Sequence, residues 1–394
     1  MKRREFLISS LAIPLVFKQI ASAKENQTTN YHPATEKTFE FFEVTGSYRD
    51  IGFQTGRQFK KHITKLIERR SGWHQNLMNI LTSRPGQEKS REYIRLTEKH
   101  FPHILQEIQG IADGSGIHFN AIWAMCIKSE LGALDNEPKG CSTLFYRDQQ
   151  RLWLFHNEDG HEAYRDIMFV LKAAPPSGVE YISMVYPGII TGNGPSMNNC
   201  GIIQTTNYIG STESEIGLPR YIIGRAVLEA KALQEALEIA TLEPRAYPYH
   251  HNIGHLGEKK YVSLETTPLS WQAEEPQANY FHTNHLIFNK TRDFEFEDEQ
   301  YKNTSSLSRY QVIEKELPQI PFNNPVPEDC IKILASHTQA PYSPCRHPQG
   351  EVTGSTLGTA FFDFKDKKMR IFRGNPCESA PQGRFADFTF ETLE

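Results

Sequence analysis

The stretch that decides the fold is residues 140–146, GCSTLFY, in which Cys141 directly follows Gly140 at the start of a predicted strand. A second predicted strand, residues 152–156 (LWLFH), follows after a short polar turn, so the two form a hairpin. Glycine tolerates backbone conformations that other residues avoid. A strained Gly140–Cys141 peptide bond suits an N-to-S acyl shift, and hydrolysis of the resulting thioester would free Cys141 as a new N-terminus. The sequence therefore predicts self-cleavage between Gly140 and Cys141.

Residues that could act with Cys141 come from two other segments. Once freed, the α-amine of Cys141, with a reference pKa of roughly 7.7–8.0, could serve as base for the thiol of the same residue. Glu158 and Asp159 end the paired strand, so their carboxylates are expected beside the start of the Cys141 strand. Asn284, within the sequence HTNH, is a neutral donor of the kind that stabilises an oxyanion.

The part of the chain before Gly140 is predicted to be mainly helical. A strand over residues 39–44 precedes a helix whose apolar residues Phe59, Ile63 and Ile67 recur at the spacing of one helix face. Further helices are expected over residues 89–113, with a break or kink at Pro102, and over residues 120–131.

The part after Gly140 alternates strands with two further helices. Helices are expected over residues 219–240 and 305–317, and strands over residues 181–186, 201–206, 261–265, 279–281, 359–364 and 369–373. Helices and antiparallel-looking strands in this order indicate an α+β layered domain.

The N-terminus has the features of an export signal. A basic start (residues 1–4, MKRR) precedes an apolar run (residues 6–17) and the small-residue sequence ASA at residues 21–23. The paired arginines resemble a twin-arginine signal, but Lys2 and Ile8 stand where that signal usually has Ser or Thr and Lys, so the general secretory route stays open. We therefore expect a signal peptide over residues 1–23, a flexible polar leader over residues 24–38, and a periplasmic or secreted protein with no stable membrane anchor.

The charge of the chain argues against a nucleic-acid partner. The net charge is −4, and loss of residues 1–23 would leave 39 basic and 46 acidic residues, a net charge of −7. A mildly acidic chain without a basic stripe lacks the electrostatic footprint of nucleic-acid binding. We therefore expect no nucleic-acid partner.

The six cysteines, at positions 126, 141, 200, 330, 345 and 377, give no metal signature. Because none is spaced C-x-x-C, a zinc ribbon or thioredoxin-like site is not expected, and the spacing leaves any disulfide pairing open. A metal enzyme built on His156 and His161 around Glu158 and Asp159 is the main alternative. His250, His251 and His255 form a second group of histidines. Their sequence, YHHNIGH (residues 249–255), predicts a strand and a turn, which does not place the histidines on one helix face. We expect no metal and no cofactor.

A serine hydrolase is not favoured, because the chain contains no G-x-S-x-G motif. A non-catalytic binding protein with the same fold is a further alternative. The presence of Cys141, Asp159 and Asn284 together favours an enzyme.

Together these motifs resemble the acyl-coenzyme A:6-aminopenicillanate acyltransferase family, the C45 cysteine peptidases among the N-terminal-nucleophile hydrolases. The motifs that carry the resemblance are, in chain order, GSYRDIG (46–52) with Gly56, EIQGIA (107–112), GCST (140–143), HNED (156–159), GLP (217–219) with Arg225, HTNH (282–285), and CRH (345–347) leading to GSTL (354–357).

The resemblance implies an αββα sandwich of two antiparallel sheets between helical layers. It also implies a precursor cut into a mainly helical segment, residues 39–140, and a segment 141–394 that carries the nucleophile, with the two remaining associated. By position, Cys141 matches the nucleophile, Asp159 the acidic residue near its amine, and Asn284 the side-chain donor of the oxyanion hole.

Three further positions are expected to bind substrate on the same grounds. Asn157 and Arg346 match recurring positions of the family. Thr353 stands where the fungal penicillin acyltransferase that typifies the family has an arginine, which argues against acyl-coenzyme A and penicillin-type substrates. The resemblance thus implies a self-processing amidohydrolase acting on an N-acyl amine, N-acyl amino acid or peptide through an acyl-Cys141 intermediate. An acyltransferase that passes the acyl group to an amine is the alternative.

Overall fold

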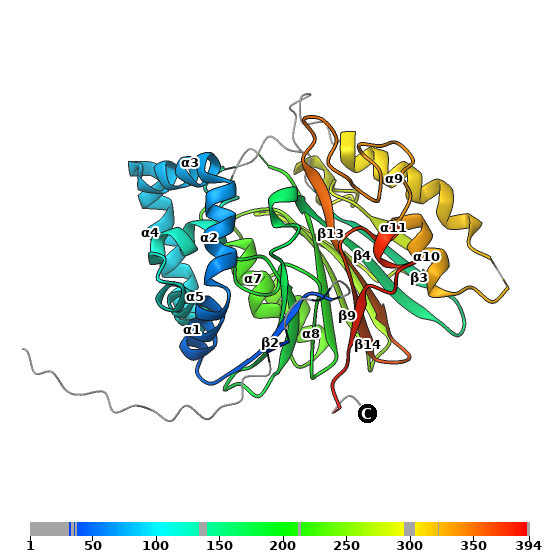
Figure 1. The fold of residues 1–394 in the computed structure, drawn as a ribbon, viewed down its shortest axis with the longest axis horizontal. Coiled ribbons are helices and arrows are strands. Elements are labelled where there is room, and N and C mark those ends of the chain that lie inside the picture. Colours follow the sequence, from blue (N-terminus) through cyan, green and yellow to red (C-terminus); the bar gives the residue numbers. More distant parts are fainter. Residues whose placement is uncertain are drawn as a thin grey trace, which may run out of the picture.

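Two sheets face each other at the centre of the molecule, between two layers of helices (Figure 1). The structure is a computed structural model that describes residues 31–32, 35, 38–133, 140–211, 214–294, 304–321 and 323–391. The predicted signal peptide and most of the predicted leader lie outside the described residues. This αββα arrangement confirms the α+β sandwich predicted from the sequence.

The larger sheet has nine strands in the order β1-β2-β5-β6-β7-β8-β9-β10-β11. Its strands are β1 (Tyr31–His32), β2 (Glu40–Thr45), β5 (Phe169–Ala174), β6 (Tyr181–Val185), β7 (Ser196–Asn198), β8 (Ile202–Tyr208), β9 (Tyr249–His255), β10 (Lys260–Thr266) and β11 (Trp271–Glu274). The smaller sheet has the order β12-β3-β4-β13-β14-β15. Its strands are β12 (Tyr280–His282), β3 (Ser142–Arg147), β4 (Leu152–His161), β13 (Gly354–Asp363), β14 (Lys368–Arg373) and β15 (Phe385–Phe388).

One helical layer lies on the side of the nine-stranded sheet and the other on the side of the six-stranded sheet (Figure 1). The first layer contains α1 (Tyr48–Gln58), α2 (Lys60–Arg69), α3 (Ser71–Thr82), α4 (Arg84–His100), α5 (Pro102–Ser115), α6 (Phe119–Cys126), α7 (Arg220–Val227) and α8 (Leu233–Ala240). The second contains α9 (Thr304–Glu316), α10 (Pro327–Leu334) and α11 (Pro376–Ser379). Among the described residues, no helix is long and apolar enough to cross a membrane.

The helical segment before Gly140 is built into the rest of the fold. Strand β2 pairs in parallel with β5, so this segment contributes a strand to the larger sheet. Helices α1 and α5 touch backbone to backbone, because a Cβ on Gly52 would lie 2.0 Å from the carbonyl oxygen of Glu107 and one on Gly110 would lie 2.2 Å from that of Arg49. Those motif glycines therefore serve helix packing.

The structure confirms the break at Pro102 and corrects two other helices. Helix α4 ends at His100, and α5 begins at Pro102, where the missing N–H costs nothing. The helix predicted over residues 219–240 is two helices, α7 and α8. The side-chain amide of Asn198 donates hydrogen bonds to the carbonyl oxygens of Leu228 and Ala230, and the chain turns at these residues between the two helices. The helix predicted over residues 120–131 ends at Cys126.

Strand register brings the predicted catalytic segment together. Strands β3 and β4 pair antiparallel with Ser142 opposite Asn157, so Cys141 lies at the same edge as Glu158 and Asp159. On the other side of β4, Thr356 of β13 lies opposite Asp159. The hairpin predicted from residues 140–156 is therefore the centre of the smaller sheet.

Candidate active site

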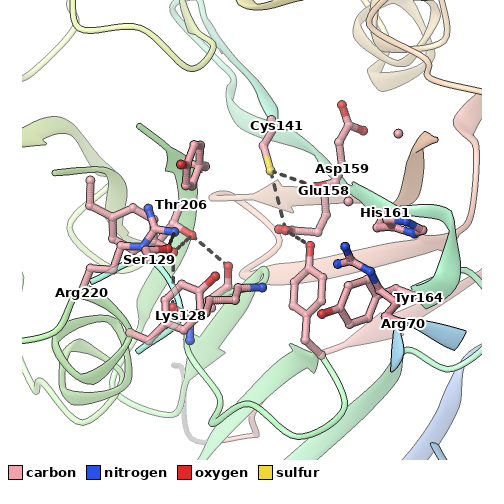
Figure 2. Close-up of a pocket in the computed structure, with 18 residues that line it drawn as sticks. Arg70, Lys128, Ser129, Cys141, Glu158, Asp159, His161, Tyr164, Thr206 and Arg220 are labelled. Atoms are coloured by element: carbon pink, nitrogen blue, oxygen red, sulfur yellow. Dashed lines mark hydrogen bonds between the residues drawn. The ribbon is translucent and has the colours of Figure 1, made fainter. Parts of the chain in front are cut away.

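Cys141 directly precedes the first residue of β3, and its thiol points toward the Glu158 carboxylate (Figure 2). Its Sγ is 3.6 Å from Glu158 Oε1 and 4.0 Å from the backbone oxygen of Asp159, and the residue is only 4% exposed. Burial, reinforced by the negative charges of Glu158 and Asp159, raises the pKa of this thiol well above its usual range. With the Gly140–Cys141 bond intact, the thiol is therefore protonated and donates to Glu158.

A buried arginine holds the backbone of Cys141 from the opposite side. Arg309, on α9, donates from Nη1 to the Cys141 carbonyl oxygen at 2.7 Å and from Nη2 to Asn284 Oδ1 at 2.7 Å. Asn284 in turn donates from Nδ2 to the backbone oxygen of Tyr208 at 2.7 Å. Because arginine has only donors and a carbonyl only accepts, these two neighbours fix the orientation of the Asn284 amide.

Gly140 fits this site because it has no side chain. Its φ is +147°, a region that favours glycine. A Cβ at this position would lie 1.9 Å from Asn284 Oδ1 and 2.7 Å from Arg309 Nη2. The predicted oxyanion donor therefore contacts the residue on the acyl side of the predicted cleavage site.

The acidic side of the site contains polar atoms without partners. Asp159 Oδ1 accepts from the Thr356 hydroxyl at 2.7 Å, but Oδ2 is buried and has no hydrogen-bond partner among the described residues. Burial raises the pKa of the Asp159 carboxyl to about 7, against the opposing effects of Arg346, Arg309 and the Thr356 hydroxyl. Glu158 Oε1 accepts a short hydrogen bond from Tyr186, whereas Oε2 lacks a hydrogen-bond partner. Such atoms in a native interior call for a functional explanation.

A pocket of about 80 Å³ opens beside the thiol. Its near wall includes Gly140, Cys141, Glu158, Asp159, Gly160 and Gly354. Its far wall is aromatic and basic, and Figure 2 shows Arg70, Lys128 and Arg220 directed toward the same space.

Arg220 occupies an unusual position in the far wall. It is 2% exposed, and its guanidinium lies 4.5–5.1 Å from the ring centres of four tyrosines, Tyr208, Tyr221, Tyr247 and Tyr249. Its Nη2 donates to the Ser129 hydroxyl, and its backbone N–H donates to Glu130. Its Nε and Nη1 are buried, and no residue in the described part of the chain bonds to them.

The three residues predicted to bind substrate lie behind the pocket wall. Asn157 is fully buried, donates to the carbonyl oxygens of Leu334 and Pro344, and accepts from Thr359, so its side chain ties strands to a loop. Contact with substrate has no support from this geometry.

Arg346 and Thr353 also stand outside the pocket lining but close to it. The Arg346 guanidinium packs against Gly354, where a Cβ would lie 2.4 Å from Nη2, and it lowers the pKa of Asp159. Thr353 precedes Gly354, which lines the pocket. The Thr353 hydroxyl is buried and has no hydrogen-bond partner among the described residues. From outside the pocket lining, the positive charge of Arg346 therefore favours the ionised form of Asp159.

Sequence reasoning missed Arg309 and Arg220, whereas it placed the carboxylates of Glu158 and Asp159 beside the start of the Cys141 strand, where the structure has them. Arg309 lies 168 positions from Cys141, on the buried face of α9 with Ser305, Val312 and Ile313. The sequence did contain a signal for Arg309, because an arginine at an inward position of a predicted helix is rarely buried without a partner. Arg220 carried the similar signal of an arginine in a helix whose residues are otherwise largely buried.

The histidines considered for a metal separate into two groups. Donor atoms of Cys141, His156 and Glu158 lie within 4.8 Å of one another. The alternative of a metal enzyme is therefore compatible with the positions of His156 and Glu158. His161 instead accepts from the backbone N–H of Ala163. The predicted cluster over residues 250–255 is a regular strand, β9, whose successive side chains alternate between faces.

Comparison with known proteins identifies the family. Residues 146–378 match the family described as acyl-coenzyme A:6-aminopenicillanic acid acyl-transferase. The chain belongs to this family. The matched range includes Asp159, Asn284, Arg309 and Arg346, and begins just after Cys141. The resemblance inferred from the motifs is thereby confirmed.

A relative with a described activity covers more of the chain. The β-alanyl-dopamine/carcinine hydrolase of Drosophila melanogaster is 22% identical over 379 residues, which covers 86% of this chain and 94% of the relative. Family and relative together indicate an amide hydrolase or acyltransferase.

Proposed function

We propose that this family member is a self-processing amide hydrolase whose nucleophile is Cys141, freed by cleavage of the Gly140–Cys141 bond. The observation that carries the proposal is the position of the Cys141 thiol, which lies 3.6 Å from a carboxylate at the mouth of a pocket and directly after a glycine. Arg309 fixes the backbone on one side of the bond, and Asn284 contacts Gly140 on the other.

Self-cleavage would use the groups already around the bond. The thiol gives its proton to Glu158, and Sγ attacks the Gly140 carbonyl carbon. The C–N bond breaks, the Cys141 nitrogen takes up a proton, and a thioester joins Gly140 to Sγ. Water then hydrolyses the thioester, which leaves a carboxylate on Gly140 and a free thiol and α-amine on Cys141.

The released amine supports turnover in the same place. We propose that Asp159 Oδ2, which has no partner before the cut, accepts a hydrogen bond from this amine and orients it. The neutral amine then takes the thiol proton, and Sγ attacks the amide carbonyl of a substrate. The protonated α-amine returns this proton to the substrate nitrogen as the C–N bond breaks, so the amine product leaves and an acyl-Cys141 thioester remains. Water then hydrolyses the thioester, which releases the carboxylic acid and the free thiol. An amine that replaced water would give acyl transfer.

The pocket favours a substrate that carries a carboxylate. Arg220 presents two buried donor atoms without partners, and the Lys128 ammonium lies 5.7–6.0 Å from the ring centres of Trp73, Tyr164 and Tyr221. Glu130 offsets part of this charge, because it accepts from the Arg220 backbone. Cations that are buried, as Arg220 is, or half-buried, as Lys128 is, bind anions more strongly than cations in water because the local dielectric constant is lower. The N-acyl amino acids are thus the preferred class, whereas the Drosophila relative is named for β-alanyl-dopamine and carcinine.

We also propose that the two segments stay associated after the cut and that the protein is exported. Association is supported by the parallel pairing of β2 with β5, which leaves the helical segment integral to the larger sheet. Export rests on the sequence of residues 1–23 alone.

The test is mass analysis and N-terminal sequencing of the purified full chain, with Cys141→Ala as control. Cleavage would give residues 24–140, which is 117 residues, and residues 141–394, which is 254 residues and begins Cys-Ser-Thr-Leu. Cys141→Ala should remain uncut and inactive. A chain that is active while uncut would refute the proposal.

The matured enzyme should then be assayed on N-acylglycines and the matching N-acylglycinamides, with and without an acceptor amine. Preference for the free carboxylate, reduced in Lys128→Met, supports the anion site. Acyl transfer to the added amine would instead indicate an acyltransferase, and absence of turnover with every amide would indicate a binding protein.

A further inference from the structure

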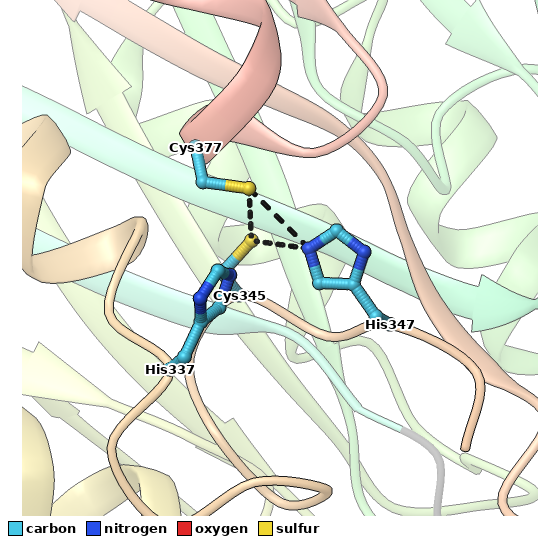
Figure 3. Close-up of side chains that lie close together, drawn as sticks. All are labelled: His337, Cys345, His347 and Cys377. Carbon is cyan, nitrogen blue, oxygen red and sulfur yellow. Dashed lines mark hydrogen bonds between the residues drawn. The ribbon is translucent and has the colours of Figure 1, made fainter. Parts of the chain in front are cut away.

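A second group of thiols and imidazoles gathers at the start of α11, apart from the residues that line the Cys141 pocket (Figure 3). It contains His337, Cys345, His347 and Cys377, which come from the loop after α10, the segment before β13 and the start of α11. One donor atom from each residue lies within 4.8 Å of all the others. None of the four residues lines the pocket beside Cys141.

The spacing of these donor atoms fits a tetrahedral metal site. Cys345 Sγ is 3.5 Å from Cys377 Sγ and 3.6 Å from His347 Nε2, and His347 Nε2 is 3.3 Å from Cys377 Sγ. Zinc binds thiolate sulfur at about 2.3 Å and imidazole nitrogen at about 2.0–2.1 Å, so the ligand atoms of a tetrahedral site lie about 3.3–3.8 Å apart. Three of the ligands therefore already lie at tetrahedral separations.

We propose that His337, Cys345, His347 and Cys377 form a structural zinc site of the Cys₂His₂ type. Two thiolates and two imidazoles are the donor set that zinc prefers in closed structural sites, and four protein ligands leave no position for a substrate. Exposed His337 offers an entry path, because Cys345 is buried and the other two are partly exposed. The spacing of the cysteines along the chain predicts no metal, so this site differs from the expectation based on sequence.

The site has a direct structural consequence for the catalytic centre. Arg346 lies between the two ligands Cys345 and His347, and its backbone N–H donates to Thr356, whose hydroxyl donates to Asp159. Asn375 braces the same segment by donating to the Arg346 carbonyl oxygen at 2.6 Å. A bound zinc ion would fix the segment that supports Asp159 from behind.

The test is the metal content of the purified full chain, measured by elemental mass spectrometry after dialysis against a metal-free buffer. We expect about one zinc ion per chain, as for a structural site. Cys345→Ser and Cys377→Ser should each lose it, whereas Cys200→Ser, which changes a half-buried cysteine outside the cluster, should keep it. Replacement by Co²⁺ should give the absorption of a tetrahedral thiolate complex, which Cys377→Ser should lack.

Cys141→Ala separates this site from the Cys141, His156 and Glu158 group. If Cys141→Ala keeps the zinc, the metal belongs to the proposed cluster. If the zinc leaves with Cys141 and stays in Cys377→Ser, the proposal is overturned. It is also overturned if the native chain is metal-free and its mass shows a Cys345–Cys377 disulfide.

Where Cys345→Ser and Cys377→Ser fail to fold, His337→Ala provides the test, because His337 is exposed. Weaker zinc retention against a chelator is expected, and retention equal to that of the parent would count against the site.

Discussion

The two sides of Cys141 differ in how completely their polar atoms are paired. On the arginine side, Arg309 holds both the Cys141 carbonyl and Asn284, and Asn284 is bonded to Tyr208. On the carboxylate side, Asp159 Oδ2, Glu158 Oε2 and His156 Nε2 are all buried without hydrogen-bond partners. His156 Nε2 lies 3.3 Å from Glu158 Oε2, but not in hydrogen-bonding geometry.

The difference indicates which side already has its hydrogen-bond partners before the Gly140–Cys141 bond is cut. The arginine side is arranged around a peptide bond that is still present, so its groups already have their partners. Buried acceptors without partners are costly, and they become useful when a new donor arrives. The α-amine released at Cys141 would be such a donor. The carboxylate side is therefore suited to the mature enzyme and the arginine side to both states.

Asn284→Ala should give the largest effect, because it removes a donor from the arginine side. Turnover should fall by roughly 10²–10³-fold, the usual cost of one lost oxyanion donor, with the fold retained. Steady-state kinetics of the matured enzyme measures it, and the control is Asn279→Ala, which removes an exposed amide whose oxygen accepts from the Arg147 backbone N–H. Activity within twofold of the parent would remove Asn284 from the site.

Gly140→Ala should slow self-cleavage by about 10²-fold, because a shift of the order of 1 Å in reacting groups has that effect. The added Cβ would meet Asn284 and Arg309 and would also disfavour a φ of +147°. The rate of fragment appearance on a gel measures it. Gly72→Ala is the matched control, since a Cβ there would meet no described atom within 4 Å beyond its chain neighbours and its own helix backbone. Equal cleavage rates in the two variants would show that the arginine side does not position the bond.

Asp159→Asn should give the smallest of the three effects, a weaker dependence of the free energy of unfolding on pH. Burial raises the pKa of Asp159 to about 7 in the folded chain, against roughly 3.9 when unfolded. The folded state therefore binds more protons between these values, and the free energy of unfolding falls as pH rises through this window. In the uncut Cys141→Ala background, Asp159→Asn should remove about 1–3 kcal/mol of this fall between pH 5 and pH 8.

Urea unfolding of the two proteins across that pH range is the measurement. Parallel stability curves for parent and variant would mean that Asp159 is already ionised before cleavage. The two sides of Cys141 would then differ less than their hydrogen bonds indicate.

The hairpin around Cys141 could be predicted because its information is local. Residues 140–156 contain a strand start, a turn and a paired strand, and antiparallel pairing then places Glu158 and Asp159 beside the thiol. The assignment of Asn284 came from the family resemblance. The role of Asn157 could not be read in this way, because its partners Leu334 and Pro344 lie more than 170 positions away.

Helix boundaries were less predictable where tertiary contacts override local preference. Residues 219–240 have the composition of one helix, yet the Asn198 side chain takes two of the carbonyl oxygens that a continuous helix would use. Pro102 was predictable because its effect on the backbone needs no distant partner.

By itself the sequence determined the strand that Cys141 begins, the glycine before it, the carboxylates opposite it and the layered α+β class. These features follow from side-chain alternation, turn chemistry and helix periodicity, all of which act over a few residues. Only the tertiary structure decided that Arg309 holds the Cys141 carbonyl, that Arg220 faces the same pocket, and that Cys345 and Cys377 meet with two histidines. Such contacts depend on how separate layers stack, and no local period encodes which distant side chains the stacking brings together.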